Sequence, residues 1–257
     1  MKHVIRDLFW SLASLFSQEK NAASILMYHS IGDNKAFFTV REEEFEKQLE
    51  YVQAHHFDVI TLSTLLEKMR QNQSLAHTVV ITFDDGYKDN YDVAFPLLKK
   101  YKMPATIFLT TDYIGSSMKL KGGMVLPMVS RQDIQEMTES GCIEFMPHTK
   151  SHVRYADDNL ESFLQEVRES RKAVETLTGR PTPLFAYPAG KYDQTLVDRI
   201  KKEGFIGAVT VDEGLVYAQS DFFVLKRNAV DSTTSMTAFK GKVSSAVEWY
   251  ERLKLWK

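Results

Sequence analysis

The sequence predicts an α/β protein whose parallel strands close into a barrel-like sheet. Short apolar runs rich in β-branched and aromatic residues alternate with amphipathic segments through most of the 257 residues, and such alternation is typical of a parallel sheet. About seven or eight strand–helix units favour closure over an open sheet. No linker rich in Pro, Gly or Ser interrupts the pattern, so residues 24–257 are predicted to form one domain.

The elements follow one another in a regular order. Strands are expected where β-branched and aromatic residues run between turn signals, at 24–28, 58–60, 78–81, 104–109, 143–146, 184–187, 206–211 and 222–226. Helices are expected where apolar residues recur at helical spacing, at 41–56, 62–69, 89–100, 131–140, 160–177, 194–203 and 244–256. Pro96 is expected to weaken or kink the third of these helices. Residues 114–130 lack either pattern and are expected to form a surface loop near the functional site.

Residues 1–23 predict an amphipathic helix in front of the domain. Apolar side chains recur at helical spacing from Val4 to Phe16, with polar and charged residues between them. The uninterrupted apolar part is too short to span a bilayer, and the acidic residues of this stretch argue against a signal peptide. Two alternatives stay open: the helix packs on the domain, or residues 1–20 make peripheral contact with a membrane.

The composition narrows the class of partner. Hydrophobic residues make up 44% of the chain and the formal net charge is -2, so there is enough apolar surface for a full core. Because there is no basic excess, nucleic acid is not expected as a partner. Cys142 is the only cysteine and cannot form an internal disulfide, which leaves the compartment open.

Two adjacent carboxylates follow the buried strand that begins at Thr78. The carboxyl ends of strands are where α/β proteins place their chemistry. Neighbouring side chains leave a strand on opposite faces, so Asp84 and Asp85 can take different roles only if the chain turns there. Gly86 permits that turn. For an isolated Asp-Asp-Gly, the alternative is a turn with a helix cap.

Polar residues also follow other predicted strands. His148 and His152 come after one strand, His29 follows another, and Tyr187 ends a third. In a barrel, the loops at the carboxyl ends of the strands all open on the same face. These residues are therefore expected to converge with the two carboxylates.

The two histidines predict a metal site when a carboxylate joins them. The spacing of His148 and His152 places two imidazoles on one side of a helical turn, where both can reach one ion. Solvated or core histidines are the alternative. With Asp85 the donor set leaves a position open for water, as a hydrolytic metal requires. Asp84 is then available as a general base towards that water.

These residues resemble the motifs of a known family. The stretch Thr82-Phe83-Asp84-Asp85-Gly86, followed by His148-Thr149-Lys150-Ser151-His152, is similar to the first two motifs of the polysaccharide deacetylases, the NodB-homology or carbohydrate esterase family 4 enzymes. The resemblance covers residues 24–230 and implies a metal-dependent N- or O-deacetylase with a distorted (β/α)7 barrel. It also implies that Asp84 is the base and that Asp85, His148 and His152 hold the metal, usually zinc.

The third motif of the family is present in altered form after the strand that ends at Tyr187. By the resemblance, the backbone N–H of Ala189 is an oxyanion donor, and Tyr187 is expected to contact the substrate. Ala186 stands where the family has the arginine that orients the base. Arg227, just beyond a late strand, is the candidate replacement that would pair with the base. A surface arginine is the alternative.

The last motif of the family, Leu-x-His, has no counterpart after His152. Met27-Tyr28-His29 has the form of this motif at the N-terminal strand end, and this arrangement resembles the circularly permuted subgroup that includes the poly-N-acetylglucosamine deacetylases. By that resemblance His29 is the general acid towards the leaving amine, and Met27 lines the pocket for the acetyl methyl group. Asp212 is expected as a partner of the His29 imidazole.

Together these features predict a metal-dependent hydrolase that removes N-acetyl groups from an amino sugar in a polysaccharide or a lipid-linked glycan. A carbohydrate-binding relative without activity is the second hypothesis, motivated by the missing motif arginine. A metal amidase acting on a non-sugar amide is the third. The expected compartment is the bacterial cell envelope or the cytoplasmic face of the inner membrane.

Overall fold

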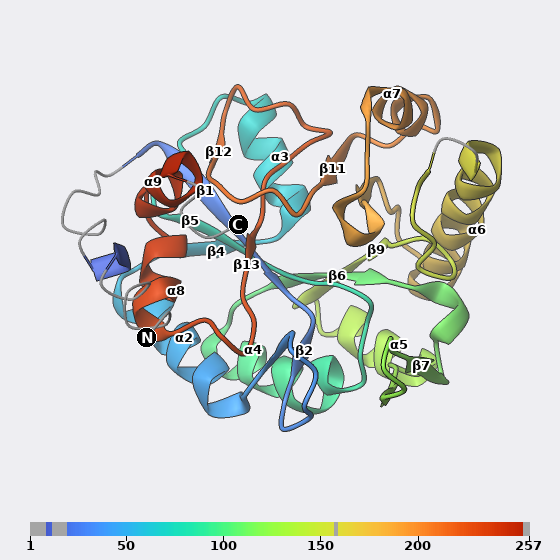
Figure 1. The fold of residues 1–257 in the computed structure, drawn as a ribbon, viewed down its shortest axis with the longest axis horizontal. Helices are drawn as coiled ribbons and strands as arrows, with labels where there is room; N and C mark the ends of the chain where they lie inside the picture. Colours follow the sequence, from blue (N-terminus) through green and yellow to red (C-terminus); the bar gives the residue numbers. More distant parts are fainter. Residues whose placement is uncertain (1–8, 12–19, 157–158, 254–257) are drawn as a thin grey trace.

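Seven parallel strands follow one another around the centre of the computed structural model, in the order in which they occur in the chain (Figure 1). They are β1 (Ala22–Tyr28), β5 (Thr78–Phe83), β6 (Ala105–Leu109), β9 (Ile143–Pro147), β10 (Leu184–Ala186), β11 (Gly207–Val209) and β13 (Asn228–Ala229). β5 pairs in parallel with both β1 and β6, and β6 pairs with β9. β10 pairs with β11, and β13 pairs with β1. The structure describes residues 9–11, 20–156 and 159–253.

The hydrogen bonding around the ring of strands is interrupted between β9 and β10. A parallel bridge between Val209 and Leu225 joins β11 to the segment that leads into β13. Among the described residues no strand pairing joins β9 to β10. A 2.9 Å hydrogen bond from His148 Nδ1, just after β9, to the Ala186 carbonyl of β10 connects the two edges. The predicted α/β class and parallel sheet are confirmed, in the form of a distorted barrel open between β9 and β10. The first and last strands of the ring, β1 and β13, are neighbours, as a circular permutation requires.

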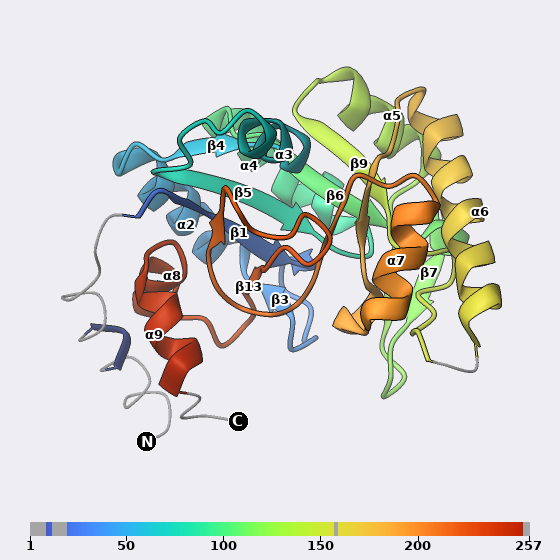
Figure 2. The ribbon, with the colours of Figure 1, turned by 90° about the horizontal axis from the view of Figure 1, so that it is seen from above.

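Helices surround the strands, as the two views in Figures 1 and 2 show. They are α2 (Glu42–Ala54), α3 (Leu62–Arg70), α4 (Phe95–Tyr101), α5 (Arg131–Glu139), α6 (Leu160–Thr178), α7 (Gln194–Lys202), α8 (Met236–Lys242) and α9 (Ala246–Leu253). α8 and α9 lie beside each other on the side of the molecule away from α6 and α7 (Figure 2). Among the described residues no helix is both long and apolar enough to cross a membrane.

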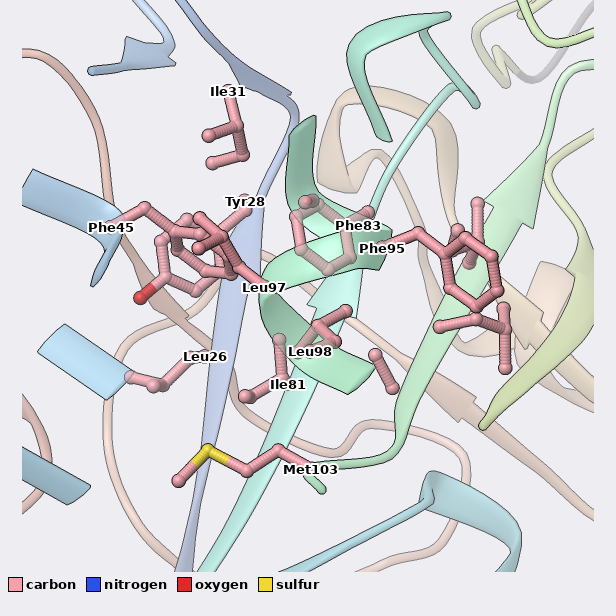
Figure 3. Packing of buried hydrophobic residues seen from close by; sticks show 14 of the residues in the cluster. Leu26, Tyr28, Ile31, Phe45, Ile81, Phe83, Phe95, Leu97, Leu98 and Met103 are labelled. Atoms are coloured by element: carbon pink, nitrogen blue, oxygen red, sulfur yellow. The ribbon is translucent and has the colours of Figure 1, made fainter. Parts of the chain in front are cut away.

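Aromatic packing outside the barrel aligns the ends of β1 and β5 (Figure 3). The ring of Tyr28 stacks on Phe83 at 5.5 Å and meets Phe45 of α2 edge-on at 5.2 Å. Each such ring pair contributes about 0.5–1.5 kcal/mol beyond the area that it buries. The Tyr28 hydroxyl donates to Gln48 Oε1 at 2.7 Å, so this buried polar group is satisfied. The register that places Tyr28 opposite Phe83 puts the residues that follow them side by side at the carboxyl edge.

Several element boundaries differ from those that the sequence predicted. β1 begins at Ala22, because Ala22 and Ala23 pair with β12 (Val216–Tyr217). The expected helix 89–100 is divided into a π-helical turn, η1 (Asn90–Ala94), and α4, which places Pro96 in the first turn of α4. A missing N–H is tolerated in a first turn. The expected C-terminal helix 244–256 corresponds to α9, whereas α8, which precedes it, was not predicted.

The loop regions contain short strands that the sequence did not reveal. The expected loop 114–130 holds a hairpin of β7 (Ser117–Lys119) and β8 (Val125–Pro127). The remaining short elements are β2 (Ser30–Ile31), β3 (Thr39–Val40), β4 (Asp58–Ile60), η2 (Thr111–Tyr113) and η4 (Pro188–Gly190). The strand predicted at 222–226 is wrong in extent: only Leu225 bridges to β11, and the strand that pairs with β1 is β13.

The described part of the N-terminal segment contacts the domain. Residues 9–11 form a helical turn, and Trp10 is buried against Tyr250 of α9, with the two rings stacked at 4.9 Å. The rest of the expected helix over residues 1–23 lies outside the described residues. That helix and its contact with a membrane stay predictions.

Candidate active site

The ends of β1 and β5 bring two of the predicted site residues together. The Asp84 N–H donates to the Tyr28 carbonyl at 2.9 Å, so Asp84 lies beside the residue that follows β1, which is His29. Side chains alternate along a strand, and Ile25 and Val80 belong to the same buried cluster. Because Met27 and His29 continue the Ile25 face of β1, they lie on the same side of the sheet as Asp84.

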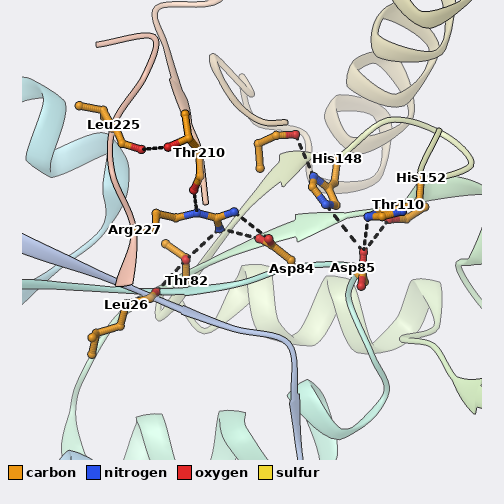
Figure 4. Close-up of polar contacts among 11 residues, drawn as sticks. Leu26, Thr82, Asp84, Asp85, Thr110, His148, His152, Thr210, Leu225 and Arg227 are labelled. Carbon is orange, nitrogen blue, oxygen red and sulfur yellow. Dashed lines mark hydrogen bonds and ion pairs between the residues drawn. The ribbon is translucent and has the colours of Figure 1, made fainter. Parts of the chain in front are cut away.

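Asp84 is held by a fully buried arginine. Arg227 Nη1 donates to Asp84 Oδ1 and Nη2 donates to Oδ2, both at 2.7 Å. The Arg227 side chain is 0% exposed and that of Asp84 is 4% exposed. The guanidinium is fixed from behind, since Nε donates to the Thr210 carbonyl at 2.8 Å and Nη1 to Thr82 Oγ1 at 3.2 Å (Figure 4). This is the pairing that the sequence analysis expected of Arg227, and the alternative of a surface arginine is wrong.

The electrostatics keep the Asp84 carboxyl ionised. Burial by itself would raise the pKa of Asp84, but the charge of Arg227, the charge of His148, the hydrogen bonds from Arg227 and the charge of His29 together outweigh burial. The pKa of Asp84 therefore lies well below its usual range. The carboxylate is available as a proton acceptor at every pH at which the protein is expected to work.

A tight turn directs Asp85 away from Asp84. Asp85 and Gly86 both have positive φ, 71° and 84°, and the Gly86 N–H donates to the Asp84 carbonyl at 2.9 Å. A Cβ at Gly86 would lie 2.5 Å from Leu109 Cδ2, so the turn requires glycine twice over. Asp85 accepts from Thr110 Oγ1 at 3.4 Å and faces the two histidines, whereas Asp84 faces Arg227 (Figure 4).

The two histidines approach Asp85 from an irregular loop after β9. His148 Nε2 lies 3.8 Å from Asp85 Oδ1, and His152 Nε2 lies 3.6 Å from the same oxygen. The expected helical turn between the histidines is wrong. Thr149 and His152 instead adopt left-handed backbone conformations, with φ of 62° and 59°. Glu166 of α6 holds this loop by accepting from the Ser151 N–H and Oγ, both at 2.8 Å.

The residues present fit a divalent metal ion. The ligand atoms of Asp85, His148 and His152 all lie within 4.8 Å of one another. Ligand atoms that lie 2.0–2.1 Å from a tetrahedral ion are about 3.3 Å from one another. The three ligand atoms therefore need to move only slightly closer together to bind such an ion. Since the Ala186 carbonyl can only accept, His148 Nδ1 carries the proton and Nε2 presents its lone pair towards Asp85. Burial lowers the pKa of His148 to about 4, so the imidazole is neutral at pH 7, which is the state that binds a metal.

His29 and Met27 lie on the side of the sheet that carries Asp84. His29 is half-buried, and its carbonyl accepts from Asn90 Nδ2 at 2.8 Å. Its imidazole packs against the Phe38 ring with centroids 5.2 Å apart. Met27 is 6% exposed and pairs with Ala229 of β13. The roles of His29 as acid and Met27 as pocket lining stay predictions.

The turn after β10 places the Ala189 backbone in a strained conformation. Ala189 has a φ of 53° and is exposed, and a left-handed conformation costs a residue other than glycine about 1–2 kcal/mol. Such strain is often stored at functional sites. The turn adjoins the metal cluster, because Ala186, three residues earlier, contacts His148. The role of the Ala189 N–H as oxyanion donor stays a prediction.

Tyr187 and Asp212 are placed differently from what the sequence predicted. The Tyr187 side chain is fully buried, and its hydroxyl donates to the Phe223 carbonyl at 3.1 Å. In this position it offers no surface to a substrate. The Asp212 carboxylate accepts from the Tyr192 hydroxyl at 2.8 Å, where a partnership with His29 was expected.

Three residues near the site were missed by the sequence analysis. Phe38 lies between His29 and Tyr87, and its ring stacks on that of Tyr87 at 5.3 Å. Burial and the Asp85 carboxylate raise the pKa of Tyr87. Asn90 supports the His29 backbone. The available signals were a Phe-Phe pair in a polar loop and an aromatic residue directly after Asp-Asp-Gly.

Comparisons with known proteins agree with this arrangement. The Bacillus subtilis protein YxkH is 29% identical over 222 residues, covering 86% of this chain and 76% of that protein. The poly-β-1,6-N-acetyl-D-glucosamine N-deacetylase of Staphylococcus epidermidis is 27% identical over 245 residues, covering 86% of this chain and 83% of that protein. The solved structure of the Streptococcus pyogenes deacetylase PplD in complex with acetate has the same fold, with a TM-score of 0.77 and 23% identity over 88% of this chain and 99% of that chain.

A family model describes the part of the chain that carries both motifs. The model for polysaccharide deacetylases matches residues 71–207, just over half of the chain. This range contains Asp84 and the cluster of Asp85, His148 and His152. The match extends from the end of α3 to the beginning of β11, so it takes in most of the barrel. The chain therefore belongs to the polysaccharide deacetylase family.

Proposed function

We propose that this protein is a metal-dependent hydrolase that removes N-acetyl groups from an amino sugar in a polysaccharide or a lipid-linked glycan. The observation that carries the proposal is the cluster of Asp85, His148 and His152 directly beside Asp84, a second carboxylate that Arg227 holds away from the cluster. A glycan substrate is supported by the relative in Staphylococcus epidermidis, which is named for deacetylation of poly-β-1,6-N-acetyl-D-glucosamine.

Asp85, His148 and His152 would hold the metal ion, for which zinc is the expected element. A bound divalent ion would lower the pKa of a water molecule and polarise the acetyl carbonyl. Two imidazoles and one carboxylate leave a position for that water. His148 needs no change of protonation to serve, because its buried imidazole is already neutral at pH 7.

Asp84 is the base in this proposal. Each Asp84 oxygen uses one lone pair for Arg227 and retains another. The carboxylate can therefore accept the proton of the attacking water while Arg227 keeps it in place. The water oxygen forms a bond to the acetyl carbon, and the Ala189 N–H donates to the oxygen on which negative charge develops.

His29 completes the reaction as the acid. When the bond between carbon and nitrogen breaks, the leaving amine needs a proton, and His29 lies beside Asp84 at the end of the neighbouring strand. Acetate and a free amino sugar are the products. Asp84 then releases the proton that it accepted to solvent, and His29 takes up a proton from solvent, which restores the starting state.

The hypothesis of a relative without activity rested on the absence of the motif arginine at position 186. Arg227 pairs with Asp84 in its place, so this absence no longer argues against activity. Arg227, the residue before β13, supplies a bidentate contact to Asp84. A metal amidase acting on a non-sugar amide would use the same cluster. A panel of amide substrates distinguishes that hypothesis from a glycan deacetylase.

Acetate release by the purified protein tests the proposal. We expect release from β-1,6- or β-1,4-linked N-acetylglucosamine oligomers, loss of that activity with a chelator, and recovery when Zn²⁺ is added back. Asp84→Asn should abolish release while the metal content of the protein is retained. Asp198→Asn, at an exposed carboxylate on α7, is the matched control and should behave as wild type. Full activity of Asp84→Asn would contradict the assignment of Asp84 as the base.

A further inference from the structure

The two histidines of the candidate metal site are held in different ways. The His148 N–H donates to the Leu109 carbonyl at 2.9 Å, and its Nδ1 donates to the Ala186 carbonyl at 2.9 Å. Backbone and ring together therefore fix the orientation of this buried imidazole. The His152 side chain is 28% exposed, and among the described residues no hydrogen bond orients its ring. The position of the His152 imidazole thus depends on the backbone that carries it.

That backbone has a conformation that needs support from outside the loop. His152 and Thr149 have φ of 59° and 62°, and left-handed conformations are unfavourable for residues other than glycine. They persist only where the surrounding structure holds them. In the first half of the loop, the N–H groups of Thr111 and Asp112 of η2 donate to the carbonyls of Thr149 and Lys150, at 3.4 Å and 2.8 Å. These two bonds end two residues before His152.

One carboxylate holds the second half of the loop. Glu166 Oε2 accepts from the Ser151 N–H at 2.8 Å, and Oε1 accepts from the Ser151 Oγ at 2.8 Å. Both carboxylate oxygens thus bind the residue directly before His152, and hydrogen bonds to an ionised group are roughly twice as strong as neutral ones. Glu166 itself lies on an anchored helix, since the nearby Phe163 and Val167 of α6 are fully buried.

We propose that Glu166 is a positioning residue that sets the affinity of the site for its metal ion by fixing His152. The inference rests on the metal site of the proposed function and deepens it. Glu166 belongs to no ligand set, because it acts through the backbone of Ser151. Without it, the segment that carries His152 is free to leave its left-handed conformation. Asp85 and His148 keep their places, so we expect metal binding to become weaker and not to be lost.

Metal affinity of the variants tests this role directly. We expect Glu166→Ala to bind Zn²⁺ about 10–100-fold more weakly than wild type, as measured by competition with a chromophoric chelator on metal-free protein. Glu166→Gln keeps a carbonyl oxygen for the Ser151 N–H and should retain most of the affinity. Glu169→Ala is the matched control. Glu169 also binds this loop from α6, through Lys150 at 3.0 Å, but the two side chains are 44% and 40% exposed, so its loss should leave the affinity unchanged.

A double-mutant cycle shows whether Glu166 acts through His152. His152→Ala removes the ligand, and Glu166→Ala is then measured with and without it. We expect Glu166→Ala to weaken Zn²⁺ binding when His152 is present and to have no further effect in the His152→Ala background. Equal weakening in both backgrounds would assign Glu166 to the stability of the fold and overturn the proposal. If Glu166→Ala does not fold, Glu166→Asp, whose carboxylate is one methylene shorter, replaces it in the cycle.

The outcomes separate this role from the proposed function. Wild-type affinity of Glu166→Ala for Zn²⁺ would refute the positioning role, while acetate release by wild type would still uphold the deacetylase. If wild type binds Zn²⁺ and releases no acetate, the proposed function fails, and the cycle still decides the role of Glu166. If wild type binds no Zn²⁺, both proposals are overturned.

Discussion

Replacement of Arg227 tests the buried ion pair at the centre of the site. The two side chains are 0% and 4% exposed and are joined by two hydrogen bonds of 2.7 Å. Removal of the guanidinium leaves the Asp84 carboxylate buried without its partner, a change that typically costs about 3–5 kcal/mol. We expect Arg227→Met to lower the free energy of unfolding by that amount at pH 7.5, as measured by urea denaturation at fixed metal concentration.

A surface pair with similar geometry provides the control. Arg168 donates to Glu203 through Nε at 2.8 Å and Nη2 at 2.5 Å, but the Arg168 side chain is 49% exposed. Exposed pairs contribute at most about 1 kcal/mol, so Arg168→Met should have a small effect. Both variants remove a guanidinium that donates two hydrogen bonds to a carboxylate. The two pairs differ in burial, and Arg227 also donates to Thr210 and Thr82. A loss for Arg227→Met no larger than that for Arg168→Met would refute the reasoning.

The pH dependence of the Arg227 variant provides a second readout. In wild type the pKa of Asp84 lies below its unfolded value, so this carboxylate contributes stability that is present above about pH 4 and is lost only at lower pH. Without Arg227, burial dominates and the pKa of Asp84 rises above its unfolded value. The folded variant then binds a proton more readily than the unfolded chain. The difference in the free energy of unfolding between wild type and the variant should therefore become smaller from pH 7.5 to pH 5. An Asp84→Asn/Arg227→Met double variant should recover most of the lost stability.

Three further predictions follow from the geometry around the site. Burial raises the pKa of Asp89 to about 6 from 3.8, so the folded state binds this proton more tightly than the unfolded chain. The free energy of unfolding should therefore fall by roughly 2–3 kcal/mol between pH 4 and pH 7, and Asp89→Asn should lose this pH dependence. The same pH profile of stability in Asp89→Asn and wild type would contradict the prediction. Gly86→Ala should cost about 1–3 kcal/mol more than Gly141→Ala in thermal unfolding, since both glycines have positive φ but only Gly86 has a neighbour in the way. Ala189→Gly should raise the free energy of unfolding by up to about 1 kcal/mol and keep activity, because the proposed donor is the backbone N–H; a loss of activity would show that the Ala189 side chain matters.

The fold was largely predictable because its signals are local. Alternation of apolar runs with amphipathic segments predicted the parallel α/β class, and the apolar run that begins at Thr78 predicted β5. β13 and the extent of the segment before it were not predictable in the same way. β13 has only two residues and forms because it pairs with β1. No run of apolar residues in the sequence indicates a strand there. The irregular path between His148 and His152 depends on contacts with α6.

For the candidate site, the residues could be predicted but their surroundings could not. Asp84, Asp85, His148 and His152 were singled out by their places after strands and by their spacing. Arg227 was chosen because one carboxylate lacked a partner, and the structure places it on Asp84. Phe38 was missed, because no spacing in the sequence indicates that a loop after β1 folds back over His29.

The sequence by itself determined which side chains stand at the carboxyl ends of the strands, because strand alternation and the glycine turn after Asp85 are set by neighbouring residues. Only the tertiary structure decided which of these side chains face one another. Arg227 reaches Asp84 across 143 positions of the chain because β13 lies beside β1, and β1 lies beside β5. The turn separates the two adjacent carboxylates, and the ring of strands brings an arginine to one of them and two histidines to the other.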